Sequence, residues 1–375
     1  MFLLKICRLA FKMIFGRFSR KKNILLILTS GLGNTIMTIP LLTELRRLKP
    51  NYKIIVAGNK SNILLVTDDR KLYDEAYTYD GDRKKLLTFL LELLITKRHN
   101  NQIAFIDFYK YVIIPYSCDG WSAFLKKIGL AKKIIFVKYK NVAAIENAIN
   151  IEYEEGKSEI ELNLAALKYL TDENSKIEVP RISITKQENE QAINYLEKHS
   201  VDKSRMIIIH GGFAKAAAVK AIPLKFIEEV LEKFSNAYEF VLLCGPDEKF
   251  FIEKNDFSKI KSKVKIFDDI SNIRILAAVL SHAKLLISAD TGPSHIAAAT
   301  GIPVISIFGP TDDKRCVPLG GLSKTVRVVK NENCDCFNCW DLNGSRSCPF
   351  ERKCLTSIPA EKIITAASEL LDSDR

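Results

Sequence analysis

The stretch SADTGPSHIAAATGIPVISIFGPTD, residues 288–312, decides the fold of this chain. It begins in the apolar run KLLISAD (284–290) and contains a second apolar run, VISIFG (304–309). A turn and an alanine-rich helical segment separate the two runs. Short apolar runs that alternate with helical segments are typical of a parallel sheet covered by helices on both faces.

The turn inside this stretch predicts an anion-binding site. Thr291, Gly292 and Pro293 form the turn, and Ser294 is the expected N-cap of the helix that follows. Free backbone N–H groups at a helix start carry partial positive charge and favour phosphate. Any parallel-sheet protein contains several ordinary turns of this kind. We favour a functional site because ligands bind at the carboxyl ends of parallel strands.

The same alternation extends over most of the chain and predicts an α/β protein with two Rossmann-like domains that face each other across a cleft. A polar segment near residues 176–189 separates the two series of apolar runs. The expected strands are 23–29, 53–58, 102–108 and 133–138 before this segment, and 206–212, 239–245, 263–267, 284–290, 304–309 and 325–329 after it. The expected units are a basic helix over 1–22, a first domain over 23–185, a second domain over 186–358 and a terminal helix over 359–375.

Composition and glycine spacing narrow the function classes. The chain has 375 residues and a formal net charge of +12, which suits an anionic substrate or an anionic membrane surface. No nucleic-acid-binding motif is recognisable, so we expect no nucleic-acid partner. After Gly31 and Gly33, the third position of a dinucleotide fingerprint is Ile36, which argues against an oxidoreductase.

The N-terminal segment MFLLKICRLAFKMIFGRFSRKKN combines apolar residues at helical spacing with many Lys and Arg residues. It contains no uncharged apolar run near the ~20 residues that a bilayer crossing needs, and no signal-peptide cleavage site is recognisable. The pattern favours a helix that lies on an anionic membrane surface. The alternatives are a helix packed on the protein itself and a frayed end.

The stretch 288–312 closely resembles the nucleotide-sugar signature of the family 9 glycosyltransferases, the heptosyltransferase family. The family pattern is D-T-G-x-x-H-x-A-A, a strand, and then G-P-T-D. The matching positions here are Asp290, Thr291, Gly292, His295, Ala297, Ala298, Gly309, Pro310, Thr311 and Asp312. Residues 24–50 and 207–223 are also similar to family elements, whereas residues 60–200 match only in general character.

This resemblance implies a GT-B fold and an inverting transfer from a nucleotide-diphosphate sugar, such as ADP-heptose, to a lipid-linked surface glycan such as lipopolysaccharide core. The donor is a substrate, and no cofactor is implied. Because no signal-peptide cleavage site is recognisable and the N-terminal segment is basic and amphipathic, we expect the chain to act in the cytoplasm, peripherally at the inner face of the cytoplasmic membrane. The residues expected to bind the donor are Lys220, Asp247, Glu248, Asp290, Thr291, Gly292, Pro293, Ser294 and His295, and the other expected cleft residues are Gly31, Gly33, Thr311 and Asp312.

Several of these residues also have an ordinary structural interpretation. Lys220 matches the family lysine that reaches the donor phosphate, although a solvated lysine at a helix start has the same sequence pattern. His295 either donates to phosphate or is a buried core histidine. Asp247 and Glu248 lie where the family places an acidic group near the ribose, and a solvated loop pair explains them equally well.

Asn34 stands where the family has an aspartate that is the expected general base. An amide cannot take up a proton near pH 7, but it can orient a hydroxyl by hydrogen bonding. Asp107, Asp119 or Asp312 is then the base, or the acceptor needs little help from a base. In the remaining interpretation the chain is a catalytically impaired nucleotide-sugar-binding partner of an active transferase.

Five cysteines lie close together near the C-terminus, at Cys334, Cys336, Cys339, Cys348 and Cys354. Four thiolates are the usual ligands of a structural zinc ion. The spacing C-x-C-x2-C-x8-C-x5-C fits no standard zinc ribbon or finger, so we favour structural thiols and leave the metal content open.

The N-terminal interpretation can be tested by deletion. Removal of residues 2–20 is expected to shift the chain from the membrane fraction to the soluble fraction, because the apolar and basic residues of a surface helix are lost. High salt is expected to release the full chain partly, since salt screens the attraction of Lys and Arg to anionic lipid. Unchanged fractionation of the truncated chain would contradict the surface-helix interpretation.

Overall fold

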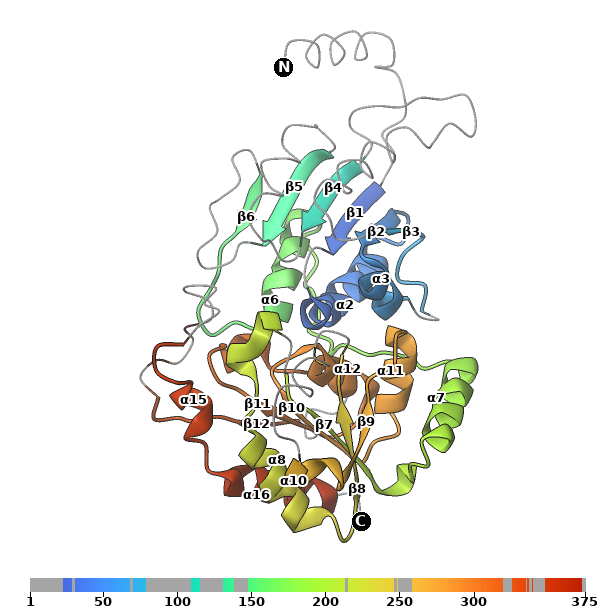
Figure 1. Cartoon of the computed structure of the whole chain (residues 1–375). Coiled ribbons are helices and arrows are strands. Elements are labelled where there is room, and N and C mark those ends of the chain that lie inside the picture. Colours follow the sequence, from blue (N-terminus) through green and yellow to red (C-terminus); the bar gives the residue numbers. More distant parts are fainter. Residues whose placement is uncertain are drawn as a thin grey trace, which may run out of the picture.

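The described part of the chain forms two six-stranded parallel sheets that follow one another in the sequence (Figure 1). The structure is a computed structural model. It describes residues 23–28, 31–67, 70–78, 109–114, 131–137, 148–212, 215–245, 248, 258–319, 326–334, 336, 339 and 348–372.

The first sheet has the strand order β3-β2-β1-β4-β5-β6. Its strands are β1 (Asn23–Leu28), β2 (Lys53–Gly58), β3 (Glu75–Thr78), β4 (Tyr109–Ile114), β5 (Ala131–Val137) and β6 (Ile149–Ile151). The helical elements of this domain are α2 (Leu32–Leu48), α3 (Lys60–Val66), α6 (Glu159–Leu164) and the 3-10 helix η1 (Ala165–Tyr169).

The second sheet has the order β12-β11-β10-β7-β8-β9. Its strands are β7 (Met206–His210), β8 (Glu239–Leu243), β9 (Val264–Phe267), β10 (Leu285–Ala289), β11 (Val304–Ile307) and β12 (Val326–Val329). Its helices are α7 (Lys186–Lys198), α8 (Leu224–Phe234), α10 (Ser258–Lys261), α11 (Ile273–Leu280), α12 (Gly292–Thr300), α13 (Asp313–Cys316), α15 (Lys353–Thr356) and α16 (Ala360–Asp372), with 3-10 turns η2 (Lys203–Arg205) and η3 (Lys215–Lys220).

Both sheets follow the same winding rule. Counted from the first strand of each domain, the order is 3-2-1-4-5-6, which is that of a Rossmann fold. The direction of winding therefore reverses between β1 and β4 in the first sheet and between β7 and β10 in the second. The predicted pair of Rossmann-like domains is confirmed, and these two points are where ligands bind in such folds.

Most of the expected strands are present. The run predicted over 102–108 lies outside the described residues, and the strand that pairs with β1 in this region is β4. The short strands β3 and β6 were not predicted, because four and three residues carry too little pattern to be recognised. All residues of β1 and β7 are buried, as expected for parallel strands covered on both faces.

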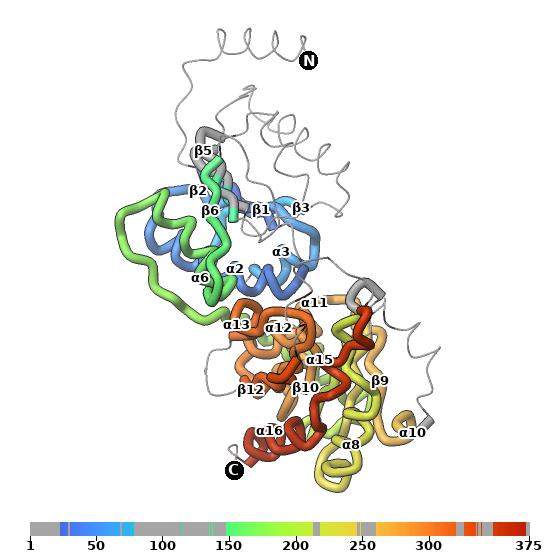
Figure 2. Tube along the Cα trace, turned by 90° about the vertical axis from the view of Figure 1, so that its left-hand side faces the viewer, coloured from blue at the N-terminus to red at the C-terminus, as the bar shows by residue number. Residues whose placement is uncertain are grey.

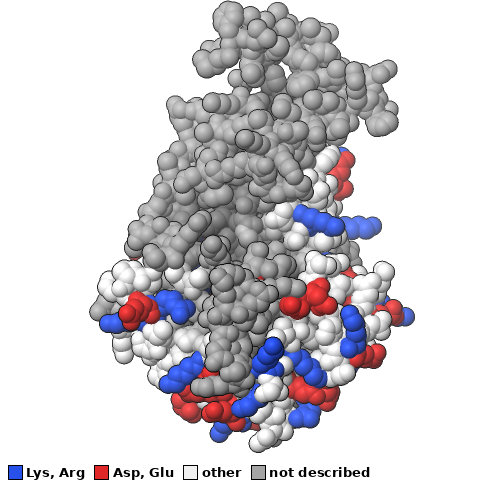
Figure 3. Space-filling model, viewed as in Figure 1, with Lys and Arg blue, Asp and Glu red and all other residues white. Residues whose placement is uncertain are grey.

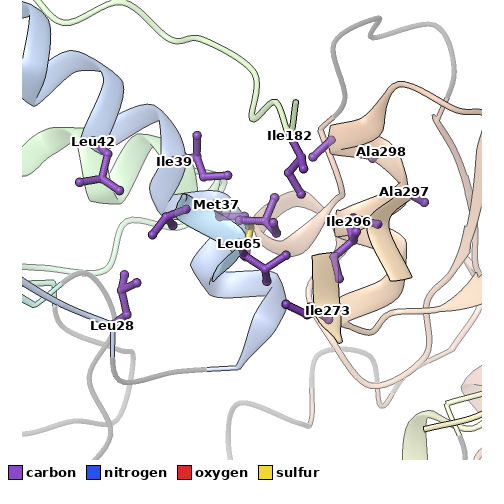
Figure 4. Close-up of a cluster of buried hydrophobic side chains, with 14 of the residues drawn as sticks. Leu28, Met37, Ile39, Leu42, Leu65, Ile182, Ile273, Ile296, Ala297 and Ala298 are labelled. Atoms are coloured by element: carbon purple, nitrogen blue, oxygen red, sulfur yellow. The ribbon is translucent and has the colours of Figure 1, made fainter. Parts of the chain in front are cut away.

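The two domains meet through apolar helix faces. Helix α2 packs against α12, and α3 packs against α11. Figure 4 shows side chains of both domains in one buried cluster, with Met37 and Leu65 on one side and Ile273 and Ile296 on the other. Figure 2 shows the same arrangement from the side, with α2 and α3 facing α11 and α12. The contact between domains is therefore a continuous hydrophobic core.

The remaining helices complete the second domain. Helix α16 packs against α8 and the strands β10, β11 and β12.

No helix within the described ranges has the length and apolarity needed to cross a membrane. On the face seen in Figure 3, the described Lys and Arg residues of the second domain are interspersed with Asp and Glu.

Candidate functional site

The N-terminal turns of α2 and α12 contact each other between the two sheets. A Cβ atom on Gly33 of α2 would lie 2.8 Å from the His295 ring of α12, and a Cβ atom on Gly292 of α12 would lie 2.9 Å from Leu32 Cβ of α2. A side chain at position 292 would push against the Cβ atom of Leu32, which is fixed to the backbone of α2, and one at position 33 would have to displace the His295 ring. Each glycine is therefore required by the opposite helix, which brings two helix N-termini to one place.

Both of these helix starts lack the groups that usually neutralise them. The N-cap residues Gly31 and Thr291 make no side-chain capping hydrogen bond, and the first turns contain no acidic residue. Free N–H groups and the positive ends of two helix dipoles therefore converge. Such a site attracts an anion.

The expectation that Ser294 is the N-cap of α12 is wrong. Thr291 has the extended backbone of an N-cap, and the Ser294 hydroxyl donates to the carbonyl of Thr291 at 2.6 Å. Ser294 is the third helical residue, because the helix already begins at Gly292. Its hydroxyl is directed back along the helix and caps no free N–H group.

A pocket of about 190 Å³ lies at the junction of the two helix starts. Both domains line it. The first domain contributes Gly31, Leu32, Gly33, Asn34, Met37 and Glu159, and the second contributes Lys220, Asp290, Thr291, Gly292, His295, Thr311, Arg315 and Cys316.

Asp290 is the electrostatic centre of the second-domain wall. Lys220 Nζ donates to Asp290 Oδ2 at 2.9 Å, and His295 Nε2 lies 3.9 Å from Asp290 Oδ1. Burial by itself would raise the pKa of Asp290, but the charge of Lys220 and the nearby His295 outweigh burial and hold the pKa below its ordinary value. Asp290 is therefore ionised at neutral pH and fixes Lys220 at the pocket.

A second buried chain of hydrogen bonds holds Thr291. Its hydroxyl lies 2.9 Å from His210 Nδ1, and His210 Nε2 lies 3.2 Å from Glu248 Oε2. The amide of Gly245 also donates to Glu248 Oε2, at 2.7 Å. Glu248 is thus buried and bound to protein groups, unlike a solvated loop residue. His210, the last residue of β7, was not among the predicted site residues.

An ion pair between the domains closes one side of the pocket. Glu159 of α6 accepts from the Arg315 guanidinium of α13 at 2.7 Å, and both side chains are almost completely buried. The Arg315 guanidinium also lies 5.0 Å from the centre of the Tyr153 ring, and the Tyr153 hydroxyl donates to Asp312 Oδ2 at 3.3 Å.

Neither partner of this ion pair was predicted. Arg315 lies three residues after the GPTD motif, so its position was an available signal. Glu159 lies where the resemblance is only general, and nothing in its local sequence indicates a site.

Several buried polar atoms of the pocket have no hydrogen-bond partner among the described residues. They include Glu159 Oε1, His295 Nδ1 and Thr311 Oγ1. Buried polar atoms in native proteins nearly always have partners. These atoms are therefore available to hydrogen-bond a polar ligand or a water molecule in the pocket.

The other predicted site residues have different positions. Asp312 caps α13 through the amides of Lys314 and Arg315. Four predicted site residues do not line the pocket, namely Pro293, Ser294, Glu248 and Asp312. Asp247 lies outside the described residues, as do Asp107 and Asp119.

The five clustered cysteines are free thiols, and Cys334 Sγ lies 3.3 Å from Cys336 Sγ. Burial and the neighbouring Cys334 raise the pKa of Cys336 to about 11. Within the described ranges, no group of three or more His, Cys, Asp or Glu side chains is arranged to hold a metal ion.

Comparison with known proteins places the chain in a family. It matches the description "Glycosyltransferase family 9 (heptosyltransferase)" over residues 121–345, and it belongs to this family. It is 30% identical to lipopolysaccharide heptosyltransferase 3 of Escherichia coli strain K12 over 152 residues. That match covers 40% of this chain and 42% of the relative, so the chain spans less than half the length of this curated relative.

Solved structures support the fold. The glycosyltransferase family 9 structure from Veillonella parvula has a TM-score of 0.73 at 19% identity, over 95% of this chain and 100% of that chain. The ADP-heptose lipopolysaccharide heptosyltransferase II of E. coli has a TM-score of 0.66 at 16% identity, over 94% of this chain and 99% of that chain. The two domains are therefore in the GT-B arrangement, as the resemblance implied.

The ionisation of Asp290 leads to a prediction on acid stability. Its pKa in the folded chain is below the ordinary value of 3.8, so its ionised form stabilises the fold above that pH. This contribution is lost as the pH falls toward the folded pKa. The free energy of unfolding of wild type should therefore exceed that of Asp290→Asn near neutral pH, and the gap should narrow below about pH 4.

Urea unfolding of both chains at a series of pH values measures this gap. Asp172→Asn, which changes an exposed carboxyl group, controls for the substitution itself. A gap between wild type and Asp290→Asn that stays constant as the pH falls would contradict the proposed role of Asp290.

Proposed function

We propose that the chain is an inverting glycosyltransferase that moves heptose or a similar sugar from a nucleotide-diphosphate sugar to a lipid-linked glycan such as lipopolysaccharide core. The observation that carries this proposal is the pocket between two uncapped helix starts, with Lys220 on its wall. Membership of glycosyltransferase family 9 supports the reaction class.

The donor diphosphate suits the positive end of this pocket. Two helix N-termini supply N–H groups and partial positive charge. Lys220 adds a full charge that is fixed by Asp290 at 2.9 Å. Together they would stabilise the charge that develops on the departing nucleotide diphosphate. We therefore propose that the reaction requires no cofactor, because residues of the chain supply the electrostatic stabilisation.

The solved relatives support ADP as the nucleotide. Two solved structures of an E. coli heptosyltransferase are described as containing ADP and ADP-2-deoxy-2-fluoro heptose, at TM-scores of 0.61 and 0.60. A curated relative carries the name lipopolysaccharide heptosyltransferase 3. By analogy, we propose an ADP-heptose-like donor and a lipopolysaccharide-type acceptor for this chain.

We also propose that the enzyme acts peripherally at the inner face of the cytoplasmic membrane. The acceptor is lipid-linked in this proposal, and the net charge of +12 favours an anionic leaflet and an anionic glycan. The basic segment 1–22 would provide the surface contact.

Asn34 favours a second candidate function. It is the third residue of α2 and lines the pocket, but its amide cannot accept a proton from an acceptor hydroxyl. A chain without a base would bind the donor without turnover and act as a partner of an active transferase. Acceptor-dependent release of ADP from ADP-heptose would exclude this alternative.

The donor site can be tested through Lys220. Lys220→Ala removes a charged hydrogen bond to the diphosphate, which is worth about 1.5–3 kcal/mol. The dissociation constant of ADP, measured by isothermal titration calorimetry, should therefore rise by about 10- to 150-fold.

Lys225→Ala is the matched control, since Lys225 is an exposed lysine on α8 that pairs with Glu229. This variant should bind ADP like wild type. Equal ADP affinity of Lys220→Ala and Lys225→Ala would contradict the proposed donor site, and so would a wild type that does not bind ADP.

A further inference from the structure

The pocket contains a carboxylate that can replace the base missing at Asn34. Among the described residues that line the pocket, the carboxylates are Asp290 and Glu159. Asp290 is engaged on both sides, by Lys220 at Oδ2 and by His295 near Oδ1. Glu159 is held through Oε2 alone, while its Oε1 is buried and has no partner among the described residues.

We propose that Glu159 is the general base of the transfer reaction, with Oε1 as the atom that accepts the proton of the acceptor hydroxyl. This inference rests on the proposed transferase function and names a catalytic residue within it. The acceptor oxygen forms a bond to the anomeric carbon, the bond from that carbon to the donor phosphate oxygen breaks, and the nucleotide diphosphate leaves with the electron pair. The proton passes to Glu159 and then to water.

The position of Glu159 suits this role. An inverting displacement needs the base on the side of the sugar opposite to the leaving diphosphate. Glu159 belongs to α6 of the first domain, whereas Lys220 and Asp290 belong to the second. The three lie around one pocket, so donor phosphate and base occupy walls contributed by different domains.

Arg315 fixes the carboxylate without occupying it fully. Its Nε and Nη2 atoms both lie 2.7 Å from Glu159 Oε2. The contact holds the orientation of the side chain and leaves Oε1 for a ligand. A buried oxygen that lacks a hydrogen bond is unfavourable, and a hydroxyl donor would remove this deficit.

The environment also adjusts the basicity of Glu159. Burial raises the pKa of this carboxyl, and the charge and hydrogen bond of Arg315 oppose the rise only in part. A raised pKa makes the carboxylate a stronger base near neutral pH. The other charged and titratable groups around the pocket are Lys220, Asp290, His295 and Cys316.

Asp312, which was considered as a base from the sequence, is less suitable. Its Oδ1 accepts from the amides of Lys314 and Arg315, and its Oδ2 accepts from the Tyr153 hydroxyl. These contacts give Asp312 a structural role at the start of α13.

The experiment compares wild type, Glu159→Gln and Glu159→Asp in an assay of ADP release from ADP-heptose with heptose-deficient lipopolysaccharide as acceptor. Glutamine keeps the shape and an oxygen for Arg315 but cannot take up a proton. Turnover of Glu159→Gln should fall by about 10²–10⁴-fold, since this is the usual contribution of a general base. Affinity for ADP should be unchanged.

The pH dependence of turnover distinguishes a catalytic role of Glu159 from a structural role. Wild-type turnover should rise with pH as Glu159 ionises, and this acid limb should disappear in Glu159→Gln and persist in Glu159→Asp. The matched control is Glu44→Gln, which changes a fully buried carboxylate that is paired with Arg47 outside the pocket. It should retain turnover and the acid limb.

The outcomes distinguish this inference from the proposed function. Turnover by wild type together with equal turnover by Glu159→Gln would overturn the role of Glu159 alone. Loss of activity in Glu159→Gln together with loss of ADP binding would indicate a structural role and would also overturn it. Wild type that binds ADP but releases none from ADP-heptose with acceptor would overturn both proposals.

Discussion

The site depends on the close contact between the first turns of α2 and α12. Gly33 faces the His295 ring and Gly292 faces Leu32 Cβ, so a side chain at either position would displace a residue of the opposite helix. The apolar cluster behind this contact holds the domains together, with Met37 and Ile296 among its members. This hydrophobic packing brings the two helix starts together at one pocket. Neither start is capped by a side chain, so both keep their partial positive charge.

Charged groups around this contact divide into two ion pairs with different roles. Lys220 and Asp290 form a pair within the second domain, where ionised Asp290 directs the lysine toward the position proposed for the diphosphate. Glu159 and Arg315 form a pair between domains, and Glu159 Oε1 has no partner among the described residues. Buried ion pairs are seldom net sources of stability. Their presence at this pocket is better explained by positioning than by stability.

The fold could be predicted largely from the sequence, because parallel strands buried on both faces appear as apolar runs such as 23–29 and 206–212. Gly31 and Gly33 were predicted as cleft residues and line the first-domain wall, and Asp290, Thr291, Gly292 and His295 of the DTGPSH motif line the second-domain wall. The features that could not be predicted depend on backbone conformation or on contacts between residues far apart in the sequence. Ser294 has the chemistry of an N-cap, but the helix begins two residues earlier, and only the backbone at Thr291 reveals this. Glu159 is held at the pocket by its ion pair with Arg315, which is 156 residues away in the sequence.

The central claim is that the pocket between α2 and α12 holds the diphosphate of a nucleotide sugar. A crystal structure of the chain with ADP tests this claim most directly. The account predicts that phosphate oxygens lie within hydrogen-bonding distance of Lys220 Nζ and of backbone N–H groups in the first turn of α12, at about 2.7–3.2 Å. A diphosphate bound outside this pocket, with no contact to Lys220, would contradict it.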